Sequence, residues 1–165
     1  MVTRSAKLAL LAGVGLYYTL VVLGNLTDFG TNYEFVRHVL SMDTTIPGNR
    51  EMWRAITSSS LQLAFYWSII LWEAATAVLV WWGWVALIRT LRQSAAVFNA
   101  AKRIAIAALT LSLFMWLVAF IAIGGEWFEM WQSSTWNGQE EAFRMFVVVG
   151  LVFLFLLQPD TESQP

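Results

Sequence analysis

Four long apolar stretches divide this chain, and their length restricts the folds open to it. A hydrocarbon layer of about 30 Å is crossed by roughly 20 helical residues. The stretches at about residues 8–29, 61–86 and 104–124 reach that length with few charges. The sequence therefore predicts an all-α fold in which these three segments cross a membrane.

The fourth apolar run, residues 143–157, is short when counted alone. Asn137 is a favoured N-cap residue, and Glu140 stands three positions after it, which is a capping pattern. Acidic side chains in the first turn are also stabilised by the helix dipole. Counted from this cap, the segment extends over about 138–157 and is long enough to span. We therefore expect a four-helix transmembrane bundle that forms a single domain, residues 1–165.

The composition is typical of a protein whose solvent is the lipid bilayer. Hydrophobic residues make up 58% of the chain, charged residues make up 13%, and ten of the 165 residues are Trp. A soluble domain of this size could not cover so much apolar surface. The net charge of -1 and the lack of a basic aromatic stripe give no sign of nucleic-acid binding.

The basic residues of the short loops indicate how the bundle is oriented. Basic side chains stay on the cytoplasmic side of a bacterial membrane. The second loop carries Arg89, Arg92, Lys102 and Arg103, and the start of the chain carries Arg4 and Lys7. The third loop, residues 124–139, holds acids and no base. Both termini are therefore expected in the cytoplasm, and the first and third loops outside.

The first outer loop is long enough to contain a helix of its own. Residues 31–42 place apolar side chains near helical spacing, and Thr31 with Glu34 could form a capping box. We expect a short amphipathic helix on the outer membrane surface. His38 lies on it and is the only His in the chain. It is expected to be an interfacial polar residue, because one His excludes a bis-His haem or a multi-His metal centre within this chain.

Sequence signatures of enzymes are missing where they would be visible. The chain has no Cys, and it contains no Gly-x-Ser-x-Gly elbow, no His-Glu-x-x-His helix and no phosphate-binding loop. No Asp-x-Asp-x-Asp-Gly spacing supports a calcium loop. We therefore expect a protein without catalytic residues, cofactor or metal.

Glu73 falls near the middle of the second span, where an ionised acid costs several kcal/mol. We expect its side chain to face the bundle interior, protonated and hydrogen-bonded. We expect the hydrogen-bond partner of its carboxyl group to be one of four residues: Tyr17, Tyr18, Thr76 or Ser112. Two roles remain open, a neutral acid that fixes helix packing and a proton or cation relay.

A second polar group gathers at the outer ends of the predicted helices. Its members are Asn25, Asp28, Glu126, Arg54 and Arg144, with Arg54 and Arg144 expected to enter the second and fourth helices. Acids and guanidinium groups at similar depth could neutralise one another and hold the helices together. A cation or small-ligand site is the alternative. Direct pairing of Glu73 with Arg144 is disfavoured, because Arg144 lies about five residues, or 8 Å, above the middle of its helix.

The Trp residues are concentrated where membrane interfaces are expected. Trp81, Trp82 and Trp84 lie at the inner end of the second span, and Trp127, Trp131 and Trp136 lie in the third loop. Indole rings prefer the interface, and they also suit protein contacts. The Trp residues of the third loop are therefore candidates for contact with a partner.

Six strings of the sequence resemble a known family. In chain order they are HVLSMDT (38–44), WRAI (53–56), GGEWF (124–128), MWQS (130–133), WNGQ (136–139) and AFR (142–144). They are similar to those of a bacterial family of predicted small integral membrane proteins, domain of unknown function 2165. The resemblance covers nearly the whole chain and implies a multi-pass protein of the bacterial inner membrane. It transfers no catalytic residue, substrate or cofactor.

Two functions are compatible with these features. The first is a non-catalytic accessory or assembly subunit that binds a membrane partner, or forms a homo-oligomer, through its Trp-rich outer loops. The alternative is a small transporter or proton- or cation-handling protein that uses Glu73 in the membrane and the outer acids Asp28 and Glu126 at its mouth.

Overall fold

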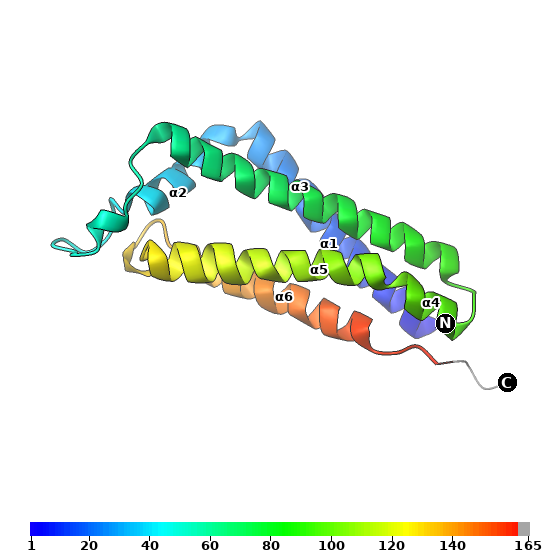
Figure 1. The fold of residues 1–165 in the computed structure, drawn as a ribbon. Coiled ribbons are helices and arrows are strands. Elements are labelled where there is room, and N and C mark those ends of the chain that lie inside the picture. Colours follow the sequence, from blue (N-terminus) through cyan, green and yellow to red (C-terminus); the bar gives the residue numbers. More distant parts are fainter. Residues whose placement is uncertain (162–165) are drawn as a thin grey trace.

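The computed structural model describes residues 1–161, and its regular elements there are all helical. The long ones are α1 (Val2–Thr27), α3 (Ser59–Thr90), α5 (Arg103–Phe114) continued by the π-helix η2 (Met115–Trp127), and α6 (Gln139–Leu157). They run side by side as an elongated bundle (Figure 1). A short helix, α4 (Ala95–Ala101), precedes α5. The predicted all-α fold is confirmed.

Three segments are long and apolar enough to cross a membrane by length and composition. They are Val2–Thr27, Ser59–Thr90 and the nearly continuous Ala95–Trp127. These correspond to the first three predicted spans. The second and third segments extend beyond both predicted limits, whereas the first begins earlier than predicted and ends two residues short of residue 29. The fourth predicted segment is present as α6, a 19-residue helix with acids in its first turn. The predicted cap is wrong: the N-cap residue is Gly138, no side chain caps the helix, and Glu140 pairs with Arg144. The side chain of Asn137 instead accepts a hydrogen bond of 3.1 Å from the backbone N–H of Gln139 in the turn before α6.

The helix predicted over residues 31–42 is present as α2 (Phe29–Ser41). Its apolar side Val36, Val39 and Leu40 is buried and packs with Tyr66 and Ile70 of α3. The predicted capping box is wrong, because the helix begins before Thr31 and the Glu34 carboxylate instead binds Arg37 at 2.6 Å. Two short 3-10 helices, η1 (Met52–Arg54) and η3 (Met130–Gln132), lie in the loops near α2.

The bundle core combines close backbone approach with hydrogen bonds from indole groups. A Cβ atom on Gly83 would lie 2.7 Å from the Cα atom of Ala105, so α3 and α5 cross where only glycine fits. Trp84 Nε1 donates to the Leu8 carbonyl at 3.1 Å, and Trp72 Nε1 donates to the Leu111 carbonyl at 3.1 Å. Small residues and buried polar bonds therefore set the positions of the helices.

A buried ionic cluster holds the two ends of the chain together. The Asp160 carboxylate lies 2.8 Å from Lys7 Nζ and 2.6 Å from Lys102 Nζ, and Arg4 Nε is 3.8 Å away. Both ammonium groups also donate to the Gln158 carbonyl. We call Arg4, Lys7, Lys102 and Asp160 the basal clasp. It fixes the start of α1 and the residues after α6 at the same end of the bundle (Figure 1).

Candidate functional site

Glu73 lies in α3 with 3% of its surface exposed, in agreement with its predicted position inside the bundle. Its carboxyl oxygen accepts a hydrogen bond of 2.6 Å from the Asn25 side-chain amide. The expected partners were wrong: Tyr18 and Ser112 bond to each other at 2.6 Å, and the Thr76 hydroxyl donates to the Trp72 carbonyl. The acid is therefore held by an amide, and Arg144 lies elsewhere.

Asn25 also bonds to Tyr66, and so it connects Glu73 with a second residue of α3. The Tyr66 hydroxyl donates to the Asn25 backbone carbonyl at 3.2 Å and lies 3.4 Å from its side-chain oxygen. Because α1 ends at Thr27, Asn25 is in its last turn, whereas Glu73 is near the middle of α3. Helix α1 therefore ends beside the half of α3 that lies toward α2, which brings together two groups that the sequence suggested were separate.

A third buried polar group was not anticipated from the sequence. The Tyr18 hydroxyl lies 2.6 Å from Ser112 Oγ and accepts a hydrogen bond of 2.8 Å from Trp116 Nε1. All three residues are buried. The sequence shows only that two apolar stretches each contain a polar side chain, Tyr18 and Ser112. Whether these two residues pair depends on how α1 packs against α5.

Arg54 does not enter α3; it ends η1, and α3 begins at Ser59. Its guanidinium group binds the Glu51 carboxylate at 2.8 Å and lies over the rings of Trp53 and Trp127, 5.4 Å and 4.8 Å from their centroids. The buried Arg54 Nε has no hydrogen-bond partner among the described residues. Two aromatic faces therefore enclose this cation by cation–π contact.

The other predicted charges do not assemble into one cluster. Arg144 is exposed on α6 and pairs with Glu140, one turn earlier, at 3.3 Å. Asp28 and Glu126 are exposed and form no salt bridge within residues 1–161. Within that part of the chain, no group of three or more His, Asp or Glu side chains is arranged to hold a metal ion.

His38 is fixed on α2 by three neighbours. Its Nδ1 atom lies 2.9 Å from the Asp43 carboxylate, and its Nε2 atom lies 3.0 Å from Arg37. Its ring stacks on Trp136 with the centroids 4.6 Å apart and the planes 11° apart. Trp136, a candidate for partner contact, is thus engaged inside the chain.

The two loops at the α2 end are bonded into one unit. The Asn49 amide donates to Glu129, Ile46 N donates to Gln132 Oε1 at 2.9 Å, and the Thr44 hydroxyl donates to Ser133 Oγ at 2.9 Å. Glu129 adopts a left-handed conformation with φ of 53°. We call residues 42–58 and 127–138 the loop cap.

Indole rings remain exposed on the loop cap. Trp53 is 69% exposed and contacts Trp127 edge to face with the centroids 5.7 Å apart. Trp131 is 49% exposed and makes no aromatic contact within residues 1–161. The loops that carry these rings are joined by hydrogen bonds, so this surface loses little conformational entropy when it binds a partner.

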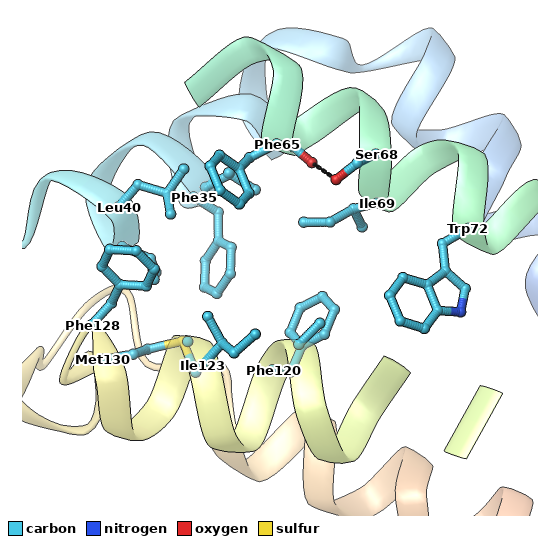
Figure 2. A pocket seen from close by; sticks show the side chains of 14 residues that line it. Phe35, Leu40, Phe65, Ser68, Ile69, Trp72, Phe120, Ile123, Phe128 and Met130 are labelled. Atoms are coloured by element: carbon cyan, nitrogen blue, oxygen red, sulfur yellow. Dashed lines mark hydrogen bonds between the residues drawn. The ribbon is translucent and has the colours of Figure 1, made fainter. Parts of the chain in front are cut away.

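A cavity of about 190 Å³ lies between α2, α3 and η2. Figure 2 shows Phe35 and Leu40 on one wall, Ile69 and Trp72 on another, and Phe120 and Ile123 on the third. Nothing in the sequence pattern marked this cavity, because it arises where η2 diverges from α3.

Comparison with known proteins assigns the family. The model of the family described as predicted small integral membrane protein (DUF2165) matches residues 3–159. No curated protein and no solved structure matches the chain. The protein is thus embedded in a lipid bilayer, and it belongs to the DUF2165 family of predicted small integral membrane proteins.

Proposed function

We propose that this protein is a non-catalytic accessory or assembly subunit of the bacterial inner membrane, which binds another integral membrane protein through its loop cap. The observation that carries the proposal is the set of exposed indole rings on a cross-linked pair of loops. The proposal includes four membrane crossings, with both termini in the cytoplasm.

The number of crossings is supported by the basal clasp. Lys7 near the start of α1 and Asp160 after the end of α6 are in direct contact. A chain whose ends lie on the same side of a membrane crosses it an even number of times. Three segments qualify as spans, so α6 is the fourth. Its 19 residues give about 28 Å at 1.5 Å per residue, close to the thickness of the hydrocarbon layer.

The orientation is supported by the distribution of charge along the bundle. The basal end carries Arg4, Lys7, Arg89, Arg92, Lys102 and Arg103. The loops at the α2 end carry an excess of acids over bases. Under the positive-inside rule, the basal clasp faces the cytoplasm and the loop cap faces the opposite side.

The partner surface is supported by exposure and by rigidity. Binding sites in protein interfaces are enriched in Trp and Arg, and preorganised groups lose less entropy on binding. The cap presents Trp53 and Trp127 against the enclosed Arg54, and Trp131 is a third exposed indole ring on it. A neighbouring membrane protein with a complementary apolar and acceptor-rich surface is the partner that this arrangement fits.

Photo-crosslinking in the host membrane tests this surface. A photoreactive amino acid replaces Trp131 in the cap or, in the matched control, Trp82, which is 59% exposed at the basal end of α3. We expect a single heterologous protein to be cross-linked from position 131 and not from position 82. Trp131→Ala should abolish copurification of that protein, and Trp82→Ala should not. Equal labelling from both positions would contradict the proposal.

A second candidate function, proton or cation handling, is favoured by one observation. Glu73 is a buried acid whose hydrogen-bond partner is an amide, and within residues 1–161 it forms no salt bridge. An intramembrane acid without a fixed counter-ion is free to exchange a proton or to meet a mobile cation. Asp28 and Glu126, both exposed, would then lie at the entrance.

Liposome flux measurements distinguish this second function. If Glu73 carries protons, Glu73→Gln abolishes the flux, and Glu141→Gln, which changes an exposed acid on α6, leaves it unchanged. Background flux of protons and monovalent cations through the folded native protein would eliminate this candidate.

A further inference from the structure

We propose that the cavity between α2, α3 and η2 binds one acyl chain of a membrane phospholipid. The walls are almost entirely apolar: apart from Ser68 and the indole N–H of Trp72, the side chains that line it are hydrocarbon, aromatic or thioether groups. Two buried residues of the loop cap, Phe128 and Met130, reach its wall, but none of the exposed indole rings of the cap lines it. The inference therefore does not rest on the proposed partner.

The two polar groups in the lining are already satisfied within the protein. The Ser68 hydroxyl donates to the Phe65 carbonyl at 2.7 Å, as drawn in Figure 2, and Trp72 Nε1 donates to the Leu111 carbonyl at 3.1 Å. A water molecule in a buried site needs two to four polar partners. Among its side chains the cavity offers only the Ser68 oxygen as a further acceptor, fewer partners than a water molecule needs, so it selects an apolar occupant.

The position of the cavity determines which apolar molecule reaches it. Four lining residues, Phe65 to Trp72, belong to the candidate span of α3, and Ala119 to Gly124 belong to the candidate span that ends in η2. At its edge, Phe65 is 42% exposed and Ile123 is 43% exposed. The surrounding medium of a membrane-embedded protein is lipid, so acyl chains are the molecules present at this opening.

The size of the cavity fits part of a single chain. Cavities of about 150 Å³ lined by Leu, Ile and Phe remain dry and bind one benzene-sized molecule. The present cavity, at about 190 Å³, accommodates a slightly larger hydrocarbon segment. It is too small for both chains of a phospholipid, whose second chain and headgroup remain in the bilayer.

Residues of the π-helix η2 form one wall of this cavity. π-Helices are rare and frequently occur at functional sites. In η2 and just after it, the lining positions fall at Ala119 and Phe120, then at Ile123 and Gly124, then at Phe128. The steps are four residues within η2 and four or five to Phe128, which follows its end, so successive turns place side chains on the same wall of the cavity.

Photolabelling in vesicles tests the inference. The protein is reconstituted into phosphatidylcholine vesicles that contain a small fraction of phosphatidylcholine with a diazirine near the middle of one acyl chain. Labelled residues are then mapped by mass spectrometry. Ala119→Phe fills the cavity, and Ala75→Phe adds the same ring at an exposed position of α3 outside it.

We expect label on lining residues of both walls, Trp72 and Phe120 among them. Ala119→Phe should lower that labelling at least about tenfold, equivalent to about 1.4 kcal/mol of binding free energy, and Ala75→Phe should leave it unchanged. Ser68→Leu fills the opposite wall and replaces Ala119→Phe if that variant does not fold. Two results would overturn the inference. One is labelling that spreads evenly over exposed helix faces and does not change in the filled variants. The other is the absence of label on the cavity residues because a second copy or a partner protein covers them.

Discussion

The side-chain amide of Asn25 donates a hydrogen bond of 2.6 Å to the carboxyl group of Glu73, across the interface between α1 and α3. This bond gives a buried acid a partner that carries no charge. Hydrogen bonds of this kind hold membrane helices in register, since no water is available to replace them. The pair therefore fixes how far α1 extends along α3.

Replacing Asn25 with Leu should lower the free energy of unfolding by about 1 kcal/mol, the scale of polar bonds between membrane helices. The carboxyl group of Glu73 would then be buried without its donor. Glu73→Gln should have a smaller effect, because an amide oxygen can still accept the bond. Unfolding in mixed micelles of SDS and a mild detergent measures both. Equal stability of Asn25→Leu and the native protein would argue against a structural role for this bond.

Tyr18→Phe should destabilise the protein by about 1–3 kcal/mol, because it leaves the buried Trp116 N–H and the Ser112 hydroxyl without their partner. Tyr17→Phe is the matched control. Its hydroxyl makes no hydrogen bond within the described residues, so the same change there should cost much less. Thermal unfolding of both variants in one detergent compares them, and equal losses would contradict the assignment.

Gly83→Ala should destabilise the bundle by about 1–3 kcal/mol through overpacking. The added methyl group would lie 2.7 Å from backbone atoms of Ala105, so α3 and α5 must move apart. Gly13→Ala in α1 meets nothing within 4 Å and should be neutral or slightly stabilising, since Ala favours helix. The order of the two melting temperatures is the readout. If Gly83→Ala melts no lower than Gly13→Ala, the close crossing is not as described.

The basal clasp should make stability depend on pH below about 4. Burial opposes the charged form of Asp160, but hydrogen bonds and charge from Lys102 and Lys7 outweigh it and hold the pKa of Asp160 below its ordinary value. The unfolded chain therefore takes up the proton first as the pH falls. The stabilisation is complete above the pKa of an unfolded Asp and is lost as the pH falls through the native pKa.

Melting curves at a series of pH values, compared between the native protein and Asp160→Asn, measure this contribution. The variant should be less stable at neutral pH, and the difference between the two proteins should shrink as the pH is lowered. A difference that stays constant down to strongly acidic pH would show that the carboxylate charge contributes nothing.

Features set by local sequence were predictable. Helices of the right length follow from apolar runs, and α2 follows from its periodicity. Each depends on neighbours within a few residues, where composition and spacing determine the conformation.

Features set by the register between distant helices were not predictable. The Asn25–Glu73 bond requires α1 to end beside the half of α3 that lies toward α2, and the Tyr18–Trp116 bond joins residues 98 positions apart. Side-chain packing sets how far one helix is shifted along another, and these shifts cannot be read from a single sequence. The start of α3 does have a local signal, because its N-cap residue is Ser58, and Ser is a favoured N-cap type; the prediction that Arg54 enters this helix overlooked it. The cavity is lined by residues from α2, α3 and η2, which are far apart in the sequence, so it too depends on how these elements pack.

Native mass spectrometry of the protein, extracted with its own lipids from the host membrane into nanodiscs, tests the central claim most directly. The account predicts a complex of defined stoichiometry that contains this chain and one other integral membrane protein, lost in Trp131→Ala and retained in Trp82→Ala. A monomer, or an assembly of this chain alone, would contradict it.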